Sequence, residues 1–236
     1  MGTFASQENQ LMRDLVQIKY GITLFIAAED LKEEEAERND EEESEGVLFT
    51  TELADFWSAR IEKENQQEFT YTVGPSGIKY ERALYQMPNE YIRLLPDSAV
   101  MQHFYTNSKG EPHLTESQLH HNPSASDWQV HTTVETVPTA TKDILGYTCH
   151  QLLITQTRIN EKEGWTIVDH YELFVTGQLY LPARLVIPLW EPVTDLCALE
   201  IKSIRPDKPN SYSLQRAVAI QRGIDPQAIE LPALYR

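Results

Sequence analysis

Histidines gathered in one polar stretch are the first group in this sequence whose type and position could support chemistry. This group consists of His103, His113, His120, His121 and His131. Imidazoles on a loop can bind Zn²⁺ or Cu²⁺. Their spacing is irregular, however, and no cysteine or closely spaced acidic residue completes a ligand set. We therefore expect no metal site, and no other cofactor.

His170 is a second candidate because acidic residues stand close to it in the sequence. In a strand, His170 and Glu172 would share one face while Asp169 points to the other. A His–Glu pair could serve acid–base catalysis, as in a hydrolase that uses loop histidines and acidic residues. A surface pair on a sheet explains the same pattern, so we predict no catalytic residue and keep the hydrolase as an alternative.

Aromatic side chains recur at positions expected to lie in strands. The first candidates for an apolar binding surface are Trp57, Tyr71, Tyr80 and Trp128. If the chain does not fill its own concave face, these side chains could line a site for an acyl chain or another apolar partner. The alternative is a structural or interaction domain whose aromatic residues form a packed core.

These side chains are positioned by strands, which we predict from the alternation of apolar and polar residues. A short helix is predicted at 5–16. Strands are predicted at 17–28, 46–51, 55–62, 68–73, 78–85, 90–95, 99–106, 128–136, 147–157, 165–176, 195–204 and 211–222. Turn signals separate them, and no regular alternation of strands with helices occurs. We predict a mainly β fold, a curved antiparallel sheet or half-barrel with one or two short helices.

Two stretches are predicted to be loops within a single domain that spans residues 1–236. Residues 29–45 carry eleven acidic side chains against Lys32 and Arg38, and such a block repels itself and stays solvated. Residues 107–127 are polar and contain glycine and prolines, which favours a long surface loop.

The net charge of −16 argues against binding to nucleic acid or to an anionic membrane surface, since both require Lys and Arg to neutralise phosphates. No apolar stretch reaches the ~18 residues that span a bilayer. Residues 1–7 lack the basic and apolar regions of a signal peptide. The chain is therefore expected to be cytoplasmic, or to begin after a removed export signal.

The two cysteines, Cys149 and Cys197, belong to no C-x-x-C motif. Three states remain open: a disulfide, two buried thiols or a reactive thiol. We expect two buried thiols, bridged only if their Cβ atoms approach to about 4 Å.

Three segments resemble a family of bacterial envelope proteins. Trp128 followed by 141–149 resembles the T-K-x-I-x-G-Y-x-C strand entry of GLPGLI-type proteins. Residues 171–182 resemble their next strand and its proline-containing bend, and 224–235 resemble a closing element shared with lipoprotein-carrier-like (LolA-like) domains. The Gly-Leu-Pro-Gly-Leu-Ile signature is absent, and residues 187–193 stand in its place.

The resemblance implies an exported protein of the periplasm or cell envelope with a lipoprotein-carrier-like fold. Many such proteins have no known activity, and the shared segments carry no catalytic residue over to this chain. We therefore expect a non-catalytic binding module for an apolar ligand, such as a lipid, an acyl chain or a lipoprotein.

Overall fold

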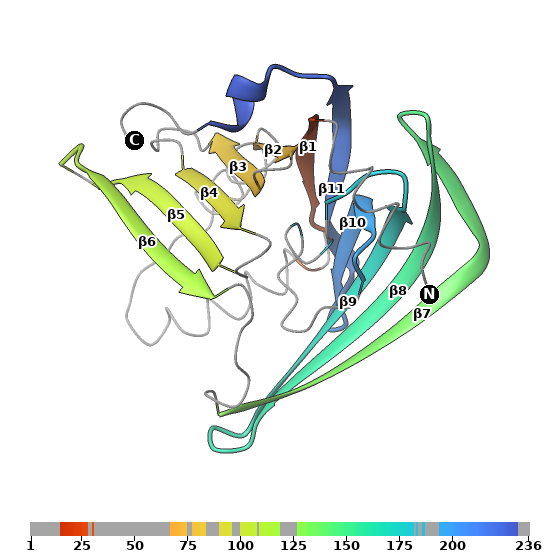
Figure 1. The fold of residues 1–236 in the computed structure, drawn as a ribbon. Helices are drawn as coiled ribbons and strands as arrows, with labels where there is room; N and C mark the ends of the chain where they lie inside the picture. The colour runs from red at the N-terminus through yellow and green to blue at the C-terminus, as the bar shows by residue number, and fades with distance from the viewer. Residues whose placement is uncertain are drawn as a thin grey trace, which may run out of the picture.

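The computed structural model describes residues 15–27, 30, 67–74, 77–83, 90–95, 100–107, 109–118, 127–181, 183, 186 and 194–230. Within these ranges eleven strands form one antiparallel sheet that stays open (Figure 1), which confirms the predicted mainly β fold. No helix in this part of the chain is long and apolar enough to cross a membrane.

The chain builds the sheet as two meanders. The first contains β1 (Val16–Phe25), β2 (Glu68–Gly74), β3 (Gly77–Ala83), β4 (Glu90–Leu95), β5 (Val100–Thr106) and β6 (Pro112–Gln118). The second contains β7 (Trp128–Ile144), β8 (Tyr147–Asn160), β9 (Trp165–Thr176), β10 (Cys197–Arg205) and β11 (Lys208–Arg222), followed by the short 3₁₀ helix η4 (Pro226–Ile229). Pairing of β1 with β11 joins the two meanders, so β6 and β7 become the two edges of the sheet.

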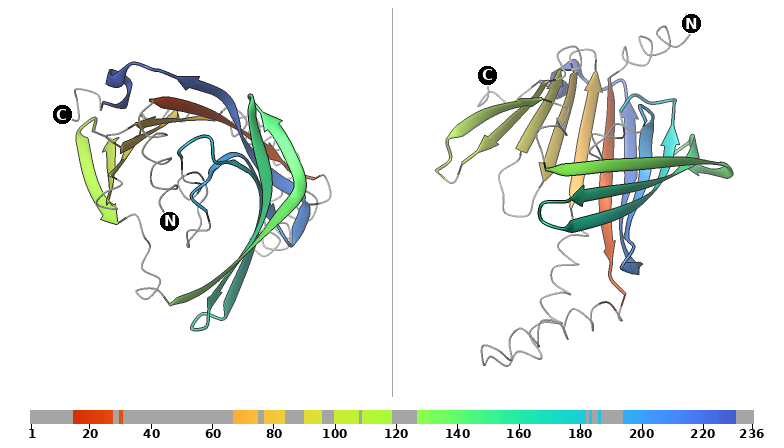
Figure 2. Two further views of the ribbon diagram at one scale, coloured as in Figure 1. Left: turned by 45° about the vertical axis from the view of Figure 1, so that its right-hand side comes forward. Right: turned by 90° about the horizontal axis from the view of Figure 1, so that it is seen from below.

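The chain that links the two edges explains why the sheet curves. Ten inter-strand spacings of about 4.8 Å would set the edges of a flat sheet about 48 Å apart. The chain from Gln118 to Trp128 can reach at most about 36 Å. The sheet must therefore curve so that its two edges approach each other. Figure 2 shows this curvature, with β6 and β7 on the two sides of the open gap.

The polar edges depart from the sequence-based expectation. The predicted loop at 107–127 is wrong over 112–118, where β6 pairs with β5. β6 is exposed over 112–117. It forms through backbone pairing with β5, so its sequence has no hydrophobic pattern from which a strand could be predicted. β7 also runs past the predicted end at 136, through Pro138 and a register shift between Val137 and Thr141. An edge strand tolerates a proline because its missing N–H costs no ladder bond on the open side.

Several predicted elements lie outside the described residues. They are the helix over 5–14, the strands at 46–51 and 55–62, and the acidic stretch 29–45 apart from Asp30. Val16, the last residue of the expected helix, already belongs to β1. The single-domain assignment stays a prediction.

The core lies where the two meanders meet. One apolar cluster joins β1 to β2 and β3 and continues to Cys197 and Leu199 of β10. A second cluster joins β8 to β9 and β10. The described part of the connection between β9 and β10 adds Leu179, Leu181 and Ala183, all at most 3% exposed, and the segment after β9 lies inside the curve of the sheet (Figure 2). Part of the concave side is thus filled by the protein itself.

The two cysteines are free and fully buried, which confirms the expectation of two buried thiols. They lie on β8 and β10, with β9 between these strands. Two strand spacings amount to about 9.6 Å, which exceeds the roughly 7 Å between Cα atoms that a disulfide can span. Burial raises the pKa of Cys149 to about 11 and that of Cys197 to about 12.

The thiols of the native protein should resist thiol–disulfide exchange at about pH 8, because the thiolate is the reactive form and burial both keeps the thiols protonated and blocks access to them. We expect no reaction with Ellman's reagent in the native state and reaction of both thiols in guanidinium chloride. Rapid native labelling would contradict burial, and unreactive thiols in the denatured chain would indicate a disulfide.

Glu200 of β10 is the centre of an ion network that ties distant strands together. Its carboxylate accepts hydrogen bonds from Lys142 of β7 at 2.8 Å and from Arg216 of β11. Burial alone would raise the pKa of Glu200, but the bonds from Lys142 and Arg216 outweigh it and leave that pKa below its ordinary value. The ionised carboxylate therefore stabilises the folded state.

Replacing Glu200 with Gln should lower the free energy of unfolding by about 2 kcal/mol at neutral pH, since two charge-assisted hydrogen bonds are weakened. The folded-state pKa lies below the unfolded one, so this contribution is complete above the unfolded pKa and is lost as the pH falls through the folded pKa. Urea unfolding should thus show a smaller difference between the two proteins at about pH 3.

The matched control is Glu172→Gln on the neighbouring strand. Glu172 and Lys202 are 3.8 Å apart, and both side chains are about one third exposed, so this change should cost at most about 1 kcal/mol. Equal losses in the free energy of unfolding for the two substitutions would contradict the larger contribution assigned to Glu200.

Candidate functional site

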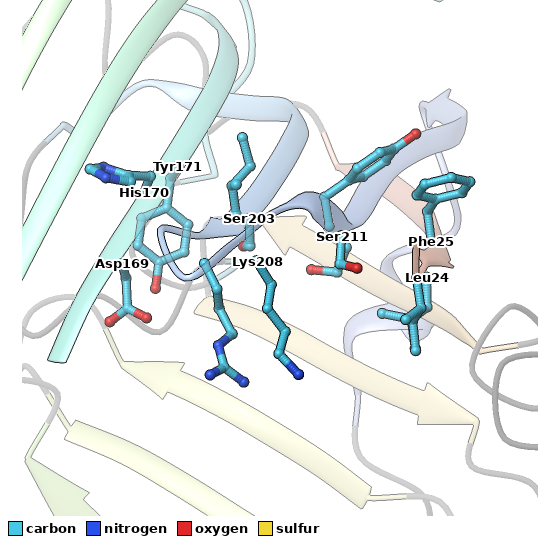
Figure 3. Close-up of a pocket in the computed structure, with 13 residues that line it drawn as sticks. Leu24, Phe25, Asp169, His170, Tyr171, Ser203, Lys208 and Ser211 are labelled. Atoms are coloured by element: carbon cyan, nitrogen blue, oxygen red, sulfur yellow. The ribbon is translucent and has the colours of Figure 1, made fainter. Parts of the chain in front are cut away.

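A pocket of about 260 Å³ lies where the end of β1 meets β9, β10 and β11 (Figure 3). Its lining consists of Leu24, Phe25, Ile26, Asp169, His170, Tyr171, Ser203, Ile204, Arg205, Lys208, Ser211, Tyr212 and Ser213. Apolar surface dominates this lining. The composition is typical of small-molecule sites, which are mostly apolar with a few polar groups that orient the ligand.

Strand register creates the hollow. Leu24 pairs with Ser213, Ser213 with Ser203, and Ser203 with Tyr171, so these four side chains form one row across four strands. Directly paired residues point to the same face of a sheet. The small serines in the middle of the row leave room between the larger Leu24 and Tyr171.

The adjacent row points to the opposite face and borders the pocket. It contains Phe25, Tyr212, Ile204 and His170 in the same strand order. Phe25 and Tyr212 stack with their ring centroids 5.2 Å apart, and the Lys202 ammonium lies 4.8 Å from the Tyr212 ring centroid. The stacked rings hold the end of β1 against β11, where the pocket begins, and the Lys202 contact joins β10 to β11.

Charged groups gather at the end of the pocket near the β10–β11 turn. Asp169 accepts a hydrogen bond from Arg158 at 2.7 Å, while Arg205 donates to Asp207. Figure 3 shows the side chains of Asp169, Tyr171 and Lys208 extending toward the same side of the sheet. Two of the three charged lining residues, Arg205 and Lys208, are cationic.

The hydroxyl groups of the pocket differ in their roles. Burial, reinforced by the Asp169 carboxylate, raises the pKa of Tyr171 to about 12, so the phenol stays neutral at physiological pH. The Ser211 hydroxyl donates to the Asp30 carboxylate and accepts from the Ala27 N–H at 2.9 Å. Ser211 therefore anchors the chain that follows β1.

The candidate acid–base residues do not act as a pair. Nδ1 of His170 lies 2.9 Å from Oγ1 of Thr155 on β8, whereas Glu172 faces Lys202. Asp169 is held by Arg158. His170 and Asp169 thus contact different residues of β8, whereas Glu172 contacts β10. This arrangement contains no relay from an acidic residue through the histidine to a nucleophile.

The histidines of the polar stretch are only partly gathered. His103 and His113 flank Tyr105, with ring centroids 5.1 and 5.5 Å from it. His131 is exposed on β7, while His120 and His121 lie outside the described residues. Within the described part of the chain, no three His, Cys, Asp or Glu side chains converge in a way that could hold a metal ion.

Three of the four predicted lining aromatics lie in the described residues, and these three do not form one surface. Tyr71 and Tyr80 are neighbours with ring centroids 4.9 Å apart. Tyr71 is only 5% exposed and packs edge-on against Tyr20. Trp128 stands at the start of β7, at the other end of the sheet. Trp57 lies outside the described residues.

Sequence reasoning missed most of the pocket. Of the lining residues, only His170 and Asp169 were considered as functional groups from the sequence, and they were considered for acid–base chemistry. Ser203 and Ser213 could have signalled a gap, because each places a small polar residue within an alternating strand. Their importance depends on the β10–β11 register, which sequence periodicity does not specify.

Comparison with known proteins places no family name on this chain. No protein-family model matches it, and no curated protein matches. A solved structure titled "Structure of PNGF-II in C2 space group" is similar with a TM-score of 0.46 and 11% sequence identity. The match covers 92% of this chain and 29% of that chain, so the present chain spans less than a third of the length of that protein.

Proposed function

We propose that this protein is a non-catalytic binding module for a short acyl chain with an anionic head. The observation that supports this function is the mainly apolar pocket around Ser203 and Ser213, with Arg205 and Lys208 at one end. The acyl chain would lie along the gap between Leu24 and Tyr171, and the head would approach the two cations.

The size of the pocket favours one short chain over a complete phospholipid. Its volume of about 260 Å³ lies just below the roughly 300–1,000 Å³ of sites for drug-sized ligands. Each buried methylene contributes about 0.8 kcal/mol. After the cost of association, an acyl chain of moderate length would therefore bind with roughly micromolar affinity.

Packing elsewhere supports this location over the central aromatic cluster. Tyr20, Tyr71 and Leu181 are each at most 5% exposed, and the Tyr20 hydroxyl donates to the Ala198 carbonyl at 2.7 Å. A ligand would have to displace these contacts to enter between the tyrosines. The pocket at the β1–β11 end instead offers space bounded by side chains in their observed positions.

Calorimetric titration with decanoate should show saturable binding with a dissociation constant in the micromolar range. The pocket-filling change Ser203→Phe should weaken it at least about tenfold, because the ring occupies the central gap. Lys208→Gln should weaken decanoate more than decanol, since only decanoate carries a charge.

Val218→Phe is the matched control, because it adds the same ring at a half-exposed position of β11 outside the pocket. Melting temperatures and a second filling variant, Ser213→Leu, separate pocket blockage from misfolding. Unchanged decanoate affinity in both folded filling variants, or no binding by the wild type, would contradict the proposal.

The packed tyrosine cluster also supports a second function, that of a structural or interaction domain. This alternative predicts no response to decanoate, decanol or decyltrimethylammonium. The envelope location and the resemblance to lipoprotein carriers stay predictions, which secretion of the full-length protein in its own host would test.

A further inference from the structure

Two tryptophans lie in one row at the far end of the β7–β8–β9 arm. Trp128 pairs with Asn160, and Asn160 pairs with Trp165, so all three side chains point to the same face. The Cα atoms of the two tryptophans are therefore two strand spacings apart, about 9.6 Å. Figure 1 shows the start of β7 and the β8–β9 turn together at this tip.

The exposure of this row is unusual for its residue types. Trp165 is 61% exposed, more than any other large hydrophobic side chain in the described ranges, and Trp128 is half-buried. Asn160 between them is only 7% exposed. Because tryptophan is highly buried on average, an exposed indole beside a second one marks a candidate interaction surface.

Polar contacts hold the two indoles in their relative positions. On either side of Trp128, Asp127 contacts Lys162 at 3.4 Å and the Gln129 amide donates to Glu161 at 2.9 Å. Both contacts tie the start of β7 to the β8–β9 turn. At that turn, the side-chain Oδ1 of Asn160 accepts a hydrogen bond from the Glu163 N–H at 3.1 Å. These contacts pre-organise the surface, so its side chains lose little conformational entropy when a ligand binds.

The charges around the indoles select the chemical class of the ligand. Asp127, Glu161 and Glu163 outnumber Lys162, and all four are exposed. Excess negative charge disfavours anionic lipids and nucleic acids. A neutral polyhydroxylated ligand suits the surface best, because the C–H faces of pyranose rings stack on indoles while their hydroxyls donate to carboxylates and amides.

We propose that the Trp128–Asn160–Trp165 row is a glycan-binding surface that takes a neutral oligosaccharide, with one sugar ring on each indole. The site is separate from the acyl-chain pocket. Asp169 lies four positions after Trp165 on β9, about 13 Å along the strand. The two sites can therefore be tested independently.

Intrinsic tryptophan fluorescence and calorimetry with cellohexaose, chitohexaose and mannohexaose provide the test. At least one hexasaccharide should bind saturably, and glucose should bind far more weakly because it covers one indole only. Trp165→Ala and Trp128→Ala should each weaken the hexasaccharide about tenfold, whereas Trp165→Phe should retain most of the affinity because it keeps a stacking ring.

Crossed controls distinguish this site from the pocket. Ser203→Phe should leave hexasaccharide affinity unchanged, and Trp165→Ala should leave decanoate affinity unchanged. The proposal is overturned if none of the hexasaccharides binds, or if folded Trp165→Ala binds them as the wild type does. Trp165-dependent binding to phosphatidylcholine vesicles without hexasaccharide binding would also overturn it, in favour of a membrane contact.

Discussion

Pairing of the first strand with the last is the interaction on which the rest of the structure depends. β1 runs antiparallel to β11 over its whole length, from Val16 opposite Arg222 to Phe25 opposite Tyr212. Without this ladder the chain would form two separate meanders, each with an exposed edge where β1 or β11 now lies. The ladder also brings Tyr20 of β1 to the Ala198 carbonyl of β10, which joins the two halves through a buried hydrogen bond.

Curvature follows from that pairing and from the reach of the chain. Once β1 and β11 are central, β6 and β7 become the edges, and the residues that connect them are too few to cross a flat sheet. Bending creates a concave side, which the β9–β10 connection partly fills with Leu179, Leu181 and Ala183. The same constraint therefore produces both the half-barrel shape and the packed centre that leaves space mainly toward one end.

The sizes of the side chains in each row of paired strands determine where the interior is packed and where a pocket remains. In the centre, Tyr71 lies beside Tyr80 and against Tyr20, so aromatic rings close the space. Toward the end of β1, serines occupy the two middle strands of the corresponding row, so a hollow remains between Leu24 and Tyr171. At the tip of the arm, two indoles flank the small Asn160 and stay accessible to solvent.

The sequence by itself determined the local elements whose hydrophobic pattern is strong. Alternation predicted β4 and β9 at their observed bounds and located β1, β2, β3, β5, β8, β10 and β11 to within a few residues, because a half-buried strand must alternate. It also indicated the burial of Cys149 and Cys197 and an antiparallel, curved architecture. Polar β6 and the proline-containing end of β7 were missed, since edge strands depend on backbone pairing and not on burial.

Only the tertiary structure decided which distant residues meet. Tyr71 and Tyr80 were proposed as a ligand surface but form part of a packed cluster, while the residues around Ser203 and Ser213 were not singled out. The physical reason is register: a shift of one residue moves every side chain of a strand to the other face. Composition and periodicity specify that strands form, whereas the pocket depends on how four of them align.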